Sequence, residues 1–279
     1  MRSTLRKEYI LNTLNDAGVL QTNEIIKQCR VSELTIRRDL IKLESKGLLI
    51  RTHGGAVKSK ASDILFSYEH KINQNRQNKE EICQTAANYI NEGDVIFVDC
   101  GTTLSAITKF ITKFKSLTII TTSLQVISDL IHYPNIRLSL VGGEIDYERQ
   151  AIYGSIAEKN IGMYHANKAF IGTDGISLKK GLSSCDDKEG STSKMMIENS
   201  DEVFLLCDSS KIENNSYIKF ASISEIHHLI TDHQITPKLL KMYRDAGVDV
   251  INDSKNSNQN IQFIQKFNHN GREVITESN

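Results

Sequence analysis

Short apolar runs alternate with helical stretches between residues 79 and 251, and this alternation constrains the fold more than any other feature of the chain. The runs are Val95–Val98, Leu117–Ile120, Ile136–Val141, Ala169–Gly172, Val203–Leu206, His228–Thr231 and Val248–Ile251. Continuous apolar runs of this length are typical of strands buried on both faces, and strands that alternate with helices favour a parallel sheet. The sequence therefore predicts an α/β fold in which helices cover both faces of a mostly parallel sheet.

Length and composition suit a two-domain globular protein. The chain has 279 residues, of which 39% are hydrophobic and 24% are charged, and domains typically span about 100–200 residues. Its five cysteines are odd in number and show no CxxC spacing, so we expect reduced thiols rather than disulfides or a metal site. The segment MRSTLRKEYIL lacks the apolar run of a signal peptide, and no segment reaches the length of a membrane span. We expect a cytoplasmic protein with no membrane partner.

Charge is distributed unevenly along the chain, although the formal net charge is zero. Residues 1–60 carry 12 Lys and Arg against 6 Asp and Glu, a balance of +6, so the remaining residues together carry −6. A basic segment joined to an acidic body suggests that the segment contacts phosphates while the body has another role. The first sixty residues are therefore where a nucleic-acid-binding motif is expected.

Three short helices are expected in this basic segment. Apolar residues at helical spacing predict the first helix over residues 4–14. Thr22 is a good N-cap for a second helix. Ser32 is a good N-cap for a third helix over residues 33–45, which Gly47 would close.

The third helix has two different faces. Ile36, Leu40 and Leu43 form one stripe and are expected to pack inward. The opposite face and its flank carry a hydroxyl and three cations, from Thr35, Arg37, Arg38 and Lys42. A helix that presents such groups suits the major groove of DNA, where arginine bonds guanine edges or clamps phosphate. Taken alone, the two arginines are equally typical of a solvated helix face.

A short hairpin is expected directly after the third helix. Leu48–Thr52 has the pattern of a strand, His53–Gly55 that of a tight turn in which glycines permit positive φ angles, and Ala56–Lys58 that of a returning strand. Such a hairpin is a wing, and it would bring three basic side chains near the DNA backbone, namely Arg51, His53 and Lys58. Helices and hairpin in this order favour DNA binding over a merely solvated face.

The segment VSELTIRRDLIKLESKGLLIRTHGGAV resembles the helix-turn-helix signature of the DeoR/GlpR family of bacterial regulators. The resemblance implies that Thr35, Arg37 and Arg38 face DNA and that His53 and Gly54 lie in the wing. Together with the pattern of the residues themselves, it gives a predicted DNA-binding set of Ser32, Thr35, Arg37, Arg38, Lys42, Arg51, His53 and Gly54. We expect a winged helix-turn-helix domain over residues 1–58 and a linker over residues 59–78.

Polar and glycine-rich clusters follow several predicted strands, at the edge where parallel sheets bind ligands. In Asp99–Thr103 a glycine, two hydroxyls and a helix start form a cradle suited to phosphate. Gly142 and its neighbouring glycine allow close backbone approach, while Asp174, Glu189 and Lys211 offer charges that could hold a sugar phosphate. Simpler roles remain open: an N-cap for Thr102 or Thr103, a turn for Asp174, a helix start for Glu189 and a solvated loop for Lys211.

Five segments between residues 79 and 232, VDCGTT, TTS, LVGGEID, AFIGTDGISLKKGLSS and DSSK, resemble in order the sensor domain of the same family. The resemblance implies a fold similar to ribose-5-phosphate isomerase, in a sensor domain that we expect over residues 79–252. The polar composition of the remaining residues predicts a tail over residues 253–279. It also implies a phosphate grip at Gly101, Thr102 and Thr103. Further polar contacts are implied at Asp99, Thr122, Arg149, Asp174, Glu189 and Lys211.

Three positions depart from the family pattern. Thr122 stands where the family has asparagine, so one hydroxyl replaces an amide. Ser193 stands where the family has lysine, and the nearest lysine, Lys194, is one residue out of register. Gly190 replaces an alanine, at a cost of about 1 kcal/mol in helix propensity. These departures leave the identity of the ligand open.

The sequence as a whole indicates a sequence-specific DNA-binding transcriptional regulator, expected to repress a carbohydrate-metabolism operon until a phosphorylated sugar binds. We expect a homodimer or homotetramer on an operator, without cofactor, metal ion or catalytic residues. One alternative is an active sugar-phosphate isomerase with Glu189 as general base, against which the DNA-binding segment argues. Another is a ligand-independent regulator, which the departures at Thr122 and Ser193 keep open.

Overall fold

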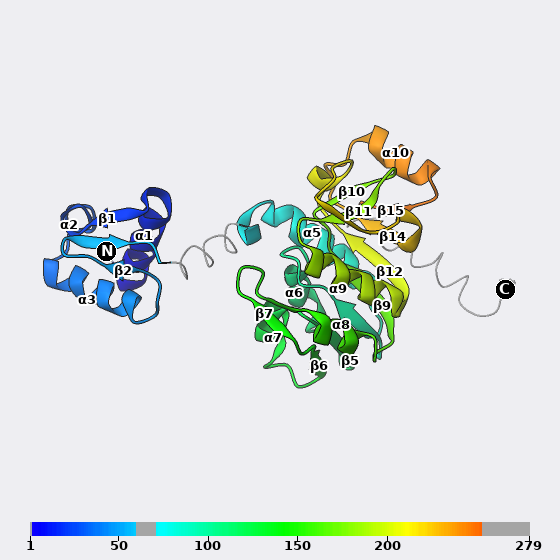
Figure 1. Ribbon diagram of the computed structural model, residues 1–279, viewed down its shortest axis with the longest axis horizontal. Coiled ribbons are helices and arrows are strands. Elements are labelled where there is room, and N and C mark those ends of the chain that lie inside the picture. The colour runs from blue at the N-terminus through cyan, green and yellow to red at the C-terminus, as the bar shows by residue number, and fades with distance from the viewer. Residues whose placement is uncertain (1, 60–70, 253–279) are drawn as a thin grey trace, which may run out of the picture. The chain divides into compact units, whose positions relative to one another are not determined.

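The computed structural model describes residues 2–59 and 71–252. Contacts divide the chain after Gln74 into two compact units, and each is described by itself (Figure 1). The predicted tail over residues 253–279 and residues 60–70 of the predicted linker lie outside the described part. No helix within the described ranges is long and apolar enough to cross a membrane.

The first unit contains three helices and a small antiparallel sheet. The helices are α1 (Ser3–Ala17), α2 (Thr22–Cys29) and α3 (Glu33–Glu44). The strands are β1 (Val19–Gln21), β2 (Ile50–Arg51) and β3 (Gly55–Val57), in the order β1-β3-β2. The three helices and the hairpin follow the prediction, whereas β1 was missed because three residues are too few to show an alternating pattern.

Two local details of the first unit differ from the prediction. Thr22 is the first residue of α2 rather than its N-cap, which is Gln21 without a side-chain hydrogen bond. Gly54 and Gly55 do not take positive φ angles. Gly55 is required instead because a Cβ there would lie 1.8 Å from the carbonyl oxygen of Leu20, where β3 pairs with β1.

A seven-stranded parallel sheet forms the centre of the second unit, which confirms the predicted α/β fold. Its strand order is β15-β14-β12-β9-β4-β5-β6, and every neighbouring pair is parallel. The strands are β4 (Val95–Val98), β5 (Leu117–Thr121), β6 (Ile136–Leu140), β9 (Ala166–Ile171), β12 (Ser200–Leu206), β14 (His228–Ile230) and β15 (Asp249–Ile251).

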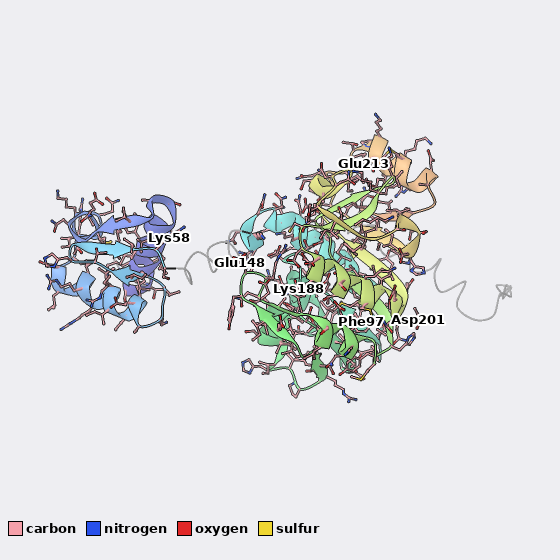
Figure 2. The ribbon with its side chains drawn as sticks, in the orientation of Figure 1. Lys58, Phe97, Glu148, Lys188, Asp201 and Glu213 are labelled. Carbon is pink, nitrogen blue, oxygen red and sulfur yellow. The ribbon has the colours of Figure 1, made fainter. Side chains whose placement is uncertain are left out.

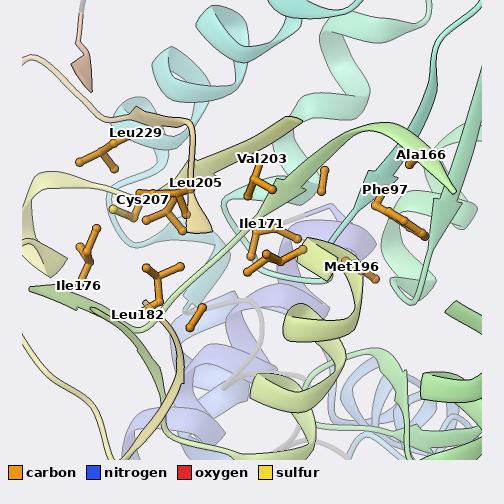
Figure 3. Close-up of a cluster of buried hydrophobic side chains, with 14 of the residues drawn as sticks. Phe97, Ala166, Ile171, Ile176, Leu182, Met196, Val203, Leu205, Cys207 and Leu229 are labelled. Atoms are coloured by element: carbon orange, nitrogen blue, oxygen red, sulfur yellow. The ribbon is translucent and has the colours of Figure 1, made fainter. Parts of the chain in front are cut away.

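Helices cover both faces of this sheet, and alternate residues of each strand enter two separate cores. On one face Phe97, Ile171 and Leu205 pack with Met196 of α9 (Figure 3). Figure 2 marks Phe97 among the side chains of the second unit. The helices on this face are α8 (Ser155–Ile161), α9 (Asp187–Glu198) and α10 (Pro237–Asp245). The other face is covered by α5 (Arg76–Ala86), α6 (Thr108–Ile111), α7 (Leu124–Leu130) and the 3-10 helices η1 (Ala87–Tyr89) and η2 (Leu104–Ile107).

Two smaller antiparallel sheets were not predicted. One is the hairpin of β7 (Glu144–Asp146) and β8 (Ala151–Tyr153). The other has the order β10-β11-β13 and consists of β10 (Gly175–Ser177), β11 (Gly181–Ser184) and β13 (Ile218–Ala221). Two further 3-10 helices complete the unit, η3 (Ser209–Lys211) and η4 (Ile223–Glu225). These insertions follow the ends of parallel strands, so they bring additional side chains to one edge of the main sheet.

Candidate functional site

Helix α3 presents its cations to the surface of the first unit. Ile36, Leu40 and Leu43 are buried in the unit's core, as the helical pattern predicted. Exposed side chains cover the remaining surface of the helix, among them Arg37, Arg38 and Lys42. The placement of these cations is therefore compatible with a helix that enters a DNA groove.

Carboxylates of the same unit pair with two of the predicted DNA-binding arginines. Nη2 of Arg37 lies 2.7 Å from Oε1 of Glu33, and Nε of Arg51 lies 2.6 Å from Oε2 of Glu44. Hydrogen bonds from Arg51 lower the pKa of Glu44. Exposed pairs of this kind add little stability, so both arginines can exchange their carboxylate for a phosphate at small cost. The Arg38 side chain has no ion pair or hydrogen bond within the described residues.

The two hydroxyls at the start of α3 stabilise the helix terminus. Oγ of Ser32 accepts a hydrogen bond from the backbone N–H of Thr35 at 3.3 Å, and lies 2.9 Å from the hydroxyl of Thr35. Both side chains are thus held at the helix start by the cap, and their contact with DNA stays a prediction. A groove next to this terminus separates α3 from the hairpin turn, and it is lined by Thr22, Asn23, Arg37, Arg51, His53 and Gly54.

A buried ion pair joins α1 to α3. Nε of Arg6 lies 2.5 Å from Oδ2 of Asp39, and both side chains are about nine-tenths buried, at 7% and 6% exposed. A buried charge is stable only beside its counter-charge, so this pair fixes α3 against α1. The pair was not predicted from the sequence, because residues 33 positions apart in the chain show no common pattern.

The strand order of the second unit reverses between β4 and β9. The chain runs from β4 outward through β5 and β6, and then returns to β9 on the other side of β4. Open α/β sheets bind ligands at such a reversal, beyond the carboxyl ends of the strands. Asp99 directly follows β4 and Gly172 directly follows β9, and Oδ2 of Asp99 accepts the Gly172 N–H at 3.1 Å.

Asp99 is fully buried beneath this edge. Besides Gly172, its carboxylate accepts hydrogen bonds from the Cys100 N–H at 2.8 Å and from the Ser193 hydroxyl at 2.9 Å. Burial raises the pKa of Asp99 despite these donors. Ser193 therefore holds Asp99 with a neutral donor, and Lys194 points elsewhere because it pairs with Glu225 and Glu198.

Arg149 is the centre of a second cluster at the same edge. Its Nη2 lies 3.1 Å from Glu189, 3.8 Å from Asp174 and 2.7 Å from Sγ of Cys185. Burial raises the pKa of Glu189 to about 7, against the opposing effect of the guanidinium. For Asp174, burial is outweighed by hydrogen bonds from Cys185 and by the Lys211 and Arg149 charges, so its pKa is lowered.

Three side chains of this cluster have the chemistry of metal ligands. Ligand atoms of Asp174, Cys185 and Glu189 lie within 4.8 Å of one another. However, the Arg149 guanidinium contacts all three and already supplies the cation that they would attract. The cluster as it stands therefore favours an arginine-centred polar site over a metal site.

The predicted phosphate cradle lies beside two lysines. The Nζ of Lys79 donates to the Thr102 hydroxyl at 3.0 Å, and the Nζ of Lys211 donates to the Thr173 carbonyl at 2.7 Å. Thr103 is buried under the cradle, and a Cβ on Gly101 would meet only a Leu104 methyl at 3.5 Å. The cradle thus combines hydroxyls and ammonium groups, which are the donors that phosphate prefers.

Thr122 and Gly142, two other predicted ligand residues, make no hydrogen bond with either cluster within the described residues. The Thr122 hydroxyl is fully buried and has no hydrogen-bond partner within the described residues. No hydrogen bond within those residues joins Gly142 to the clusters above. The close approach expected there belongs to Gly143, where a Cβ would lie 2.6 Å from the Tyr153 carbonyl oxygen. The close backbone contact at Gly143 therefore serves the packing of the β7–β8 hairpin and not the binding of a ligand.

Family comparisons agree with the two-part organisation. Residues 6–61 match the DeoR-like helix-turn-helix domain, and residues 74–233 match the DeoR C terminal sensor domain. The chain belongs to the DeoR family. This membership confirms the family resemblance that the sequence showed, and it makes the chain a DNA-binding transcription regulator rather than an enzyme.

Two curated DeoR-family relatives illustrate the similarity. An uncharacterized HTH-type transcriptional regulator of Bacillus subtilis, YulB, is 35% identical over 88% of this chain and 95% of its own length. The HTH-type transcriptional repressor GlcR of the same organism is 31% identical over 87% of this chain and 93% of its own length. A solved structure of ribose 5-phosphate isomerase A from Methanocaldococcus jannaschii aligns with 50% of this chain and 55% of its own, at 19% identity and a TM-score of 0.37. That score is too low to carry weight.

Within this DeoR-family chain, the structure brings forward residues that the sequence analysis left out. Lys79 and Ser193 contact predicted ligand residues, although neither was a predicted contact itself. A signal for Lys79 was present, because it occupies the apolar stripe of its helix together with Ile82 and Cys83. Gly190 also gains an explanation, since a Cβ there would lie 3.1 Å from Cβ of Phe220 on β13.

Proposed function

We propose that this DeoR-family regulator represses a carbohydrate-metabolism operon, and that a phosphorylated sugar lowers its affinity for the operator. The observation that carries the proposal is the site at the reversal between β4 and β9. There a hydroxyl and lysine cradle adjoins a partly buried cluster of arginine and carboxylates. A phosphate suits the cradle, and the hydroxyls of a sugar suit the arginine and carboxylates.

The DNA-binding part of the proposal assigns α3 to the major groove and the β2–β3 hairpin to the neighbouring backbone. Its contacts would come from Ser32, Thr35, Arg37, Arg38, Lys42, Arg51, His53 and Gly54. One small module offers limited contact area, so the protein would bind as a homodimer or homotetramer on repeated half-sites in the cytoplasm.

The sensor part of the proposal assigns the effector to the carboxyl edge of the main sheet. Gly101, Thr102, Thr103 and Lys211 would hold the phosphate, while Asp99, Arg149, Asp174 and Glu189 would hold the sugar hydroxyls. The buried hydroxyl of Thr122 and the backbone of Gly142 would complete the site. Glu189 is suited to this role because a carboxyl with a pKa near 7 can both donate and accept hydrogen bonds.

The experiment combines DNA binding with an effector screen. Labelled duplexes from the region upstream of the gene and its neighbours are titrated with the full-length protein, and hexose and pentose monophosphates are then added. We expect one duplex to bind specifically and one sugar phosphate to release it. The same compound should stabilise the protein by about 2.7 kcal/mol at 100 times its dissociation constant. Specific DNA binding with no response to any phosphate would favour a ligand-independent regulator instead.

A further inference from the structure

Helix α5 lies along the phosphate cradle, which it contacts through Lys79 and Cys83, while its N-cap Asn75 contacts Asp208. Nδ2 of Asn75 donates to Oδ1 of Asp208 at 3.5 Å, and Nζ of Lys79 donates to the Thr102 hydroxyl at 3.0 Å. One turn further, Sγ of Cys83 donates to the Thr103 carbonyl at 2.9 Å. Since residues four apart share one face of a helix, Lys79 and Cys83 place one face of α5 against the segment after β4, and the N-cap Asn75 contacts Asp208 after β12.

Lys79 occupies an unusual position on this face. Only 6% of the residue is exposed, although lysine is rarely so buried, and its helical neighbours Ile82 and Cys83 belong to the core. Among the titratable groups that face it are the Lys211 ammonium, the Asp208 carboxylate and the neutral Cys83 thiol. Burial and the Lys211 charge lower the pKa of Lys79 to about 8. Two ammonium groups are thus held near one another at the place where the cradle would receive an anion.

We propose that Lys79 binds the effector's phosphate together with Thr102 and Lys211, and so makes α5 the helix that responds to effector binding. This inference rests on the proposed function. A phosphate between the two ammonium groups would replace their repulsion by two charge-assisted hydrogen bonds. Because α5 begins at Arg76, directly after the segment that leads from the DNA-binding unit, any movement of Lys79 toward a phosphate acts on the start of that connection.

The test uses the full-length protein with Lys79→Met, Lys79→Arg and Lys238→Met. Lys238 is an exposed lysine on α10 and serves as the matched control. Inorganic phosphate and the panel of sugar monophosphates, each beside its unphosphorylated sugar, are titrated by calorimetry. Loss of a charge-assisted hydrogen bond should weaken phosphate binding by about 10–100-fold in Lys79→Met. Lys79→Arg should recover part of the affinity because it keeps the charge, and Lys238→Met should bind as the wild type does.

Two further readouts separate phosphate binding from a structural role. The rise in melting temperature that phosphate produces should be smaller in Lys79→Met than in the wild type, whereas a merely structural role for Lys79 would lower the melting temperature of the free protein and leave this rise unchanged. Phosphate binding at pH 8 should take up roughly half a proton in the wild type and less in Lys79→Met, measured in buffers of different ionisation enthalpy. The phosphate concentration that releases DNA should rise with the loss of affinity.

The results for Lys79→Met and for the wild type distinguish a failure of the Lys79 assignment from a failure of the proposed function. If Lys79→Met binds phosphate and the sugar phosphates as tightly as the wild type, the assignment of Lys79 is wrong while the regulator remains effector-dependent. The same conclusion follows if the variant only lowers the melting temperature of the free protein. If the wild type itself binds neither inorganic phosphate nor any sugar phosphate, the proposed effector function fails, and this inference fails with it.

Discussion

The two units of this regulator place their charged side chains in opposite ways. In the DNA-binding unit Arg37, Arg38 and Lys42 lie on the surface, and the two ion pairs of its arginines at Glu33 and Glu44 are exposed. In the sensor unit the corresponding groups are largely buried, with Arg149 only 20% exposed and Glu189 only 14%. DNA is a large ligand that meets cations at a surface, whereas a small metabolite must be enclosed to be recognised. Each arrangement therefore suits the size of its ligand.

Each unit also contains a buried charge cluster away from its predicted ligand contacts. Arg6 and Asp39 form a buried pair in the unit whose other cations are exposed. In the sensor unit His228 lies between Glu202 and Asp249, on strands β14, β12 and β15, and it takes no part in the clusters at the carboxyl edge. Both clusters have structural roles. Substitutions in them test how far the burial of a charged side chain determines the free energy of unfolding that is lost with its partner.

The largest effect is expected for Asp39→Ala. The substitution leaves the Arg6 guanidinium buried without its carboxylate, which costs about 3–5 kcal/mol. Small units are stable by only a few kcal/mol, so the DNA-binding unit should unfold while the sensor unit stays folded. Differential scanning calorimetry should show the loss of one transition, and hydrogen exchange should locate it in residues 2–59.

Arg6→Met combined with Asp39→Leu provides the control, because removal of both charges avoids an uncompensated one. The double variant should recover most of the lost stability. Equal destabilisation by the single and double changes would mean that packing, rather than charge, holds α1 against α3.

The next effect concerns pH and the sensor unit. Burial lowers the pKa of His228, but hydrogen bonds with Asp249 and Glu202 outweigh it and raise the pKa to about 9. The unfolded value is about 6.5, so the stabilisation is complete below about pH 6.5 and is lost as the pH rises through 9. The shift corresponds to about 3 kcal/mol, which urea unfolding at pH 6 and pH 9.5 should detect.

His228→Phe isolates this contribution, since it keeps a ring stacked on Phe204 and removes the charge. Lys79 titrates in a similar range in both proteins, so the difference between their pH profiles reports His228 alone. If the pH profiles of the wild type and His228→Phe are parallel, the charge of His228 beside Glu202 and Asp249 contributes nothing to stability.

The same contrast explains what the sequence could predict. The exposed cations of α3 lie within one helix, so helical periodicity placed Ile36 inside and Arg38 outside. Strand runs likewise gave the parallel sheet, because each buried strand has its own local pattern. Asp99 and Ser193 are brought together from segments 94 positions apart, and the small sheets that carry Arg149 and Asp174 have no strong pattern of their own. Their contacts depend on tertiary packing, which a single sequence does not encode locally.

Within the DNA-binding unit, Arg38→Ala should weaken operator binding more than Arg37→Ala. Loss of a base-contacting arginine costs about 1–3 kcal/mol and relaxes base preference at one position. Arg37 must first exchange its bond to Glu33, so its net contribution should be smaller. Fluorescence anisotropy on the selected operator and on its single-base variants measures both effects. Unchanged affinity and base preference in Arg38→Ala would mean that α3 is not the recognition helix.

The smallest effect is expected for Thr122→Val in the sensor unit. The Thr122 hydroxyl is fully buried without a hydrogen-bond partner within the described residues. Burial of a hydroxyl without a hydrogen-bond partner is unfavourable, and a methyl group in its place avoids this desolvation. The free protein should therefore gain about 1 kcal/mol in its free energy of unfolding. If this hydroxyl is kept for the effector, the same variant should bind the effector more weakly.

Thr121→Val is the matched control, because the neighbouring hydroxyl donates to the Val98 carbonyl at 2.6 Å and accepts the Ser123 N–H at 3.0 Å. Its loss should destabilise the protein by about 1–3 kcal/mol, the opposite sign to Thr122→Val. A gain in stability paired with weaker effector binding at Thr122 would show that an unsatisfied group is maintained for a ligand. Stabilisation with unchanged effector binding would instead assign Thr122 to the hydrophobic core. The effector site would then include Asp99 but not Thr122.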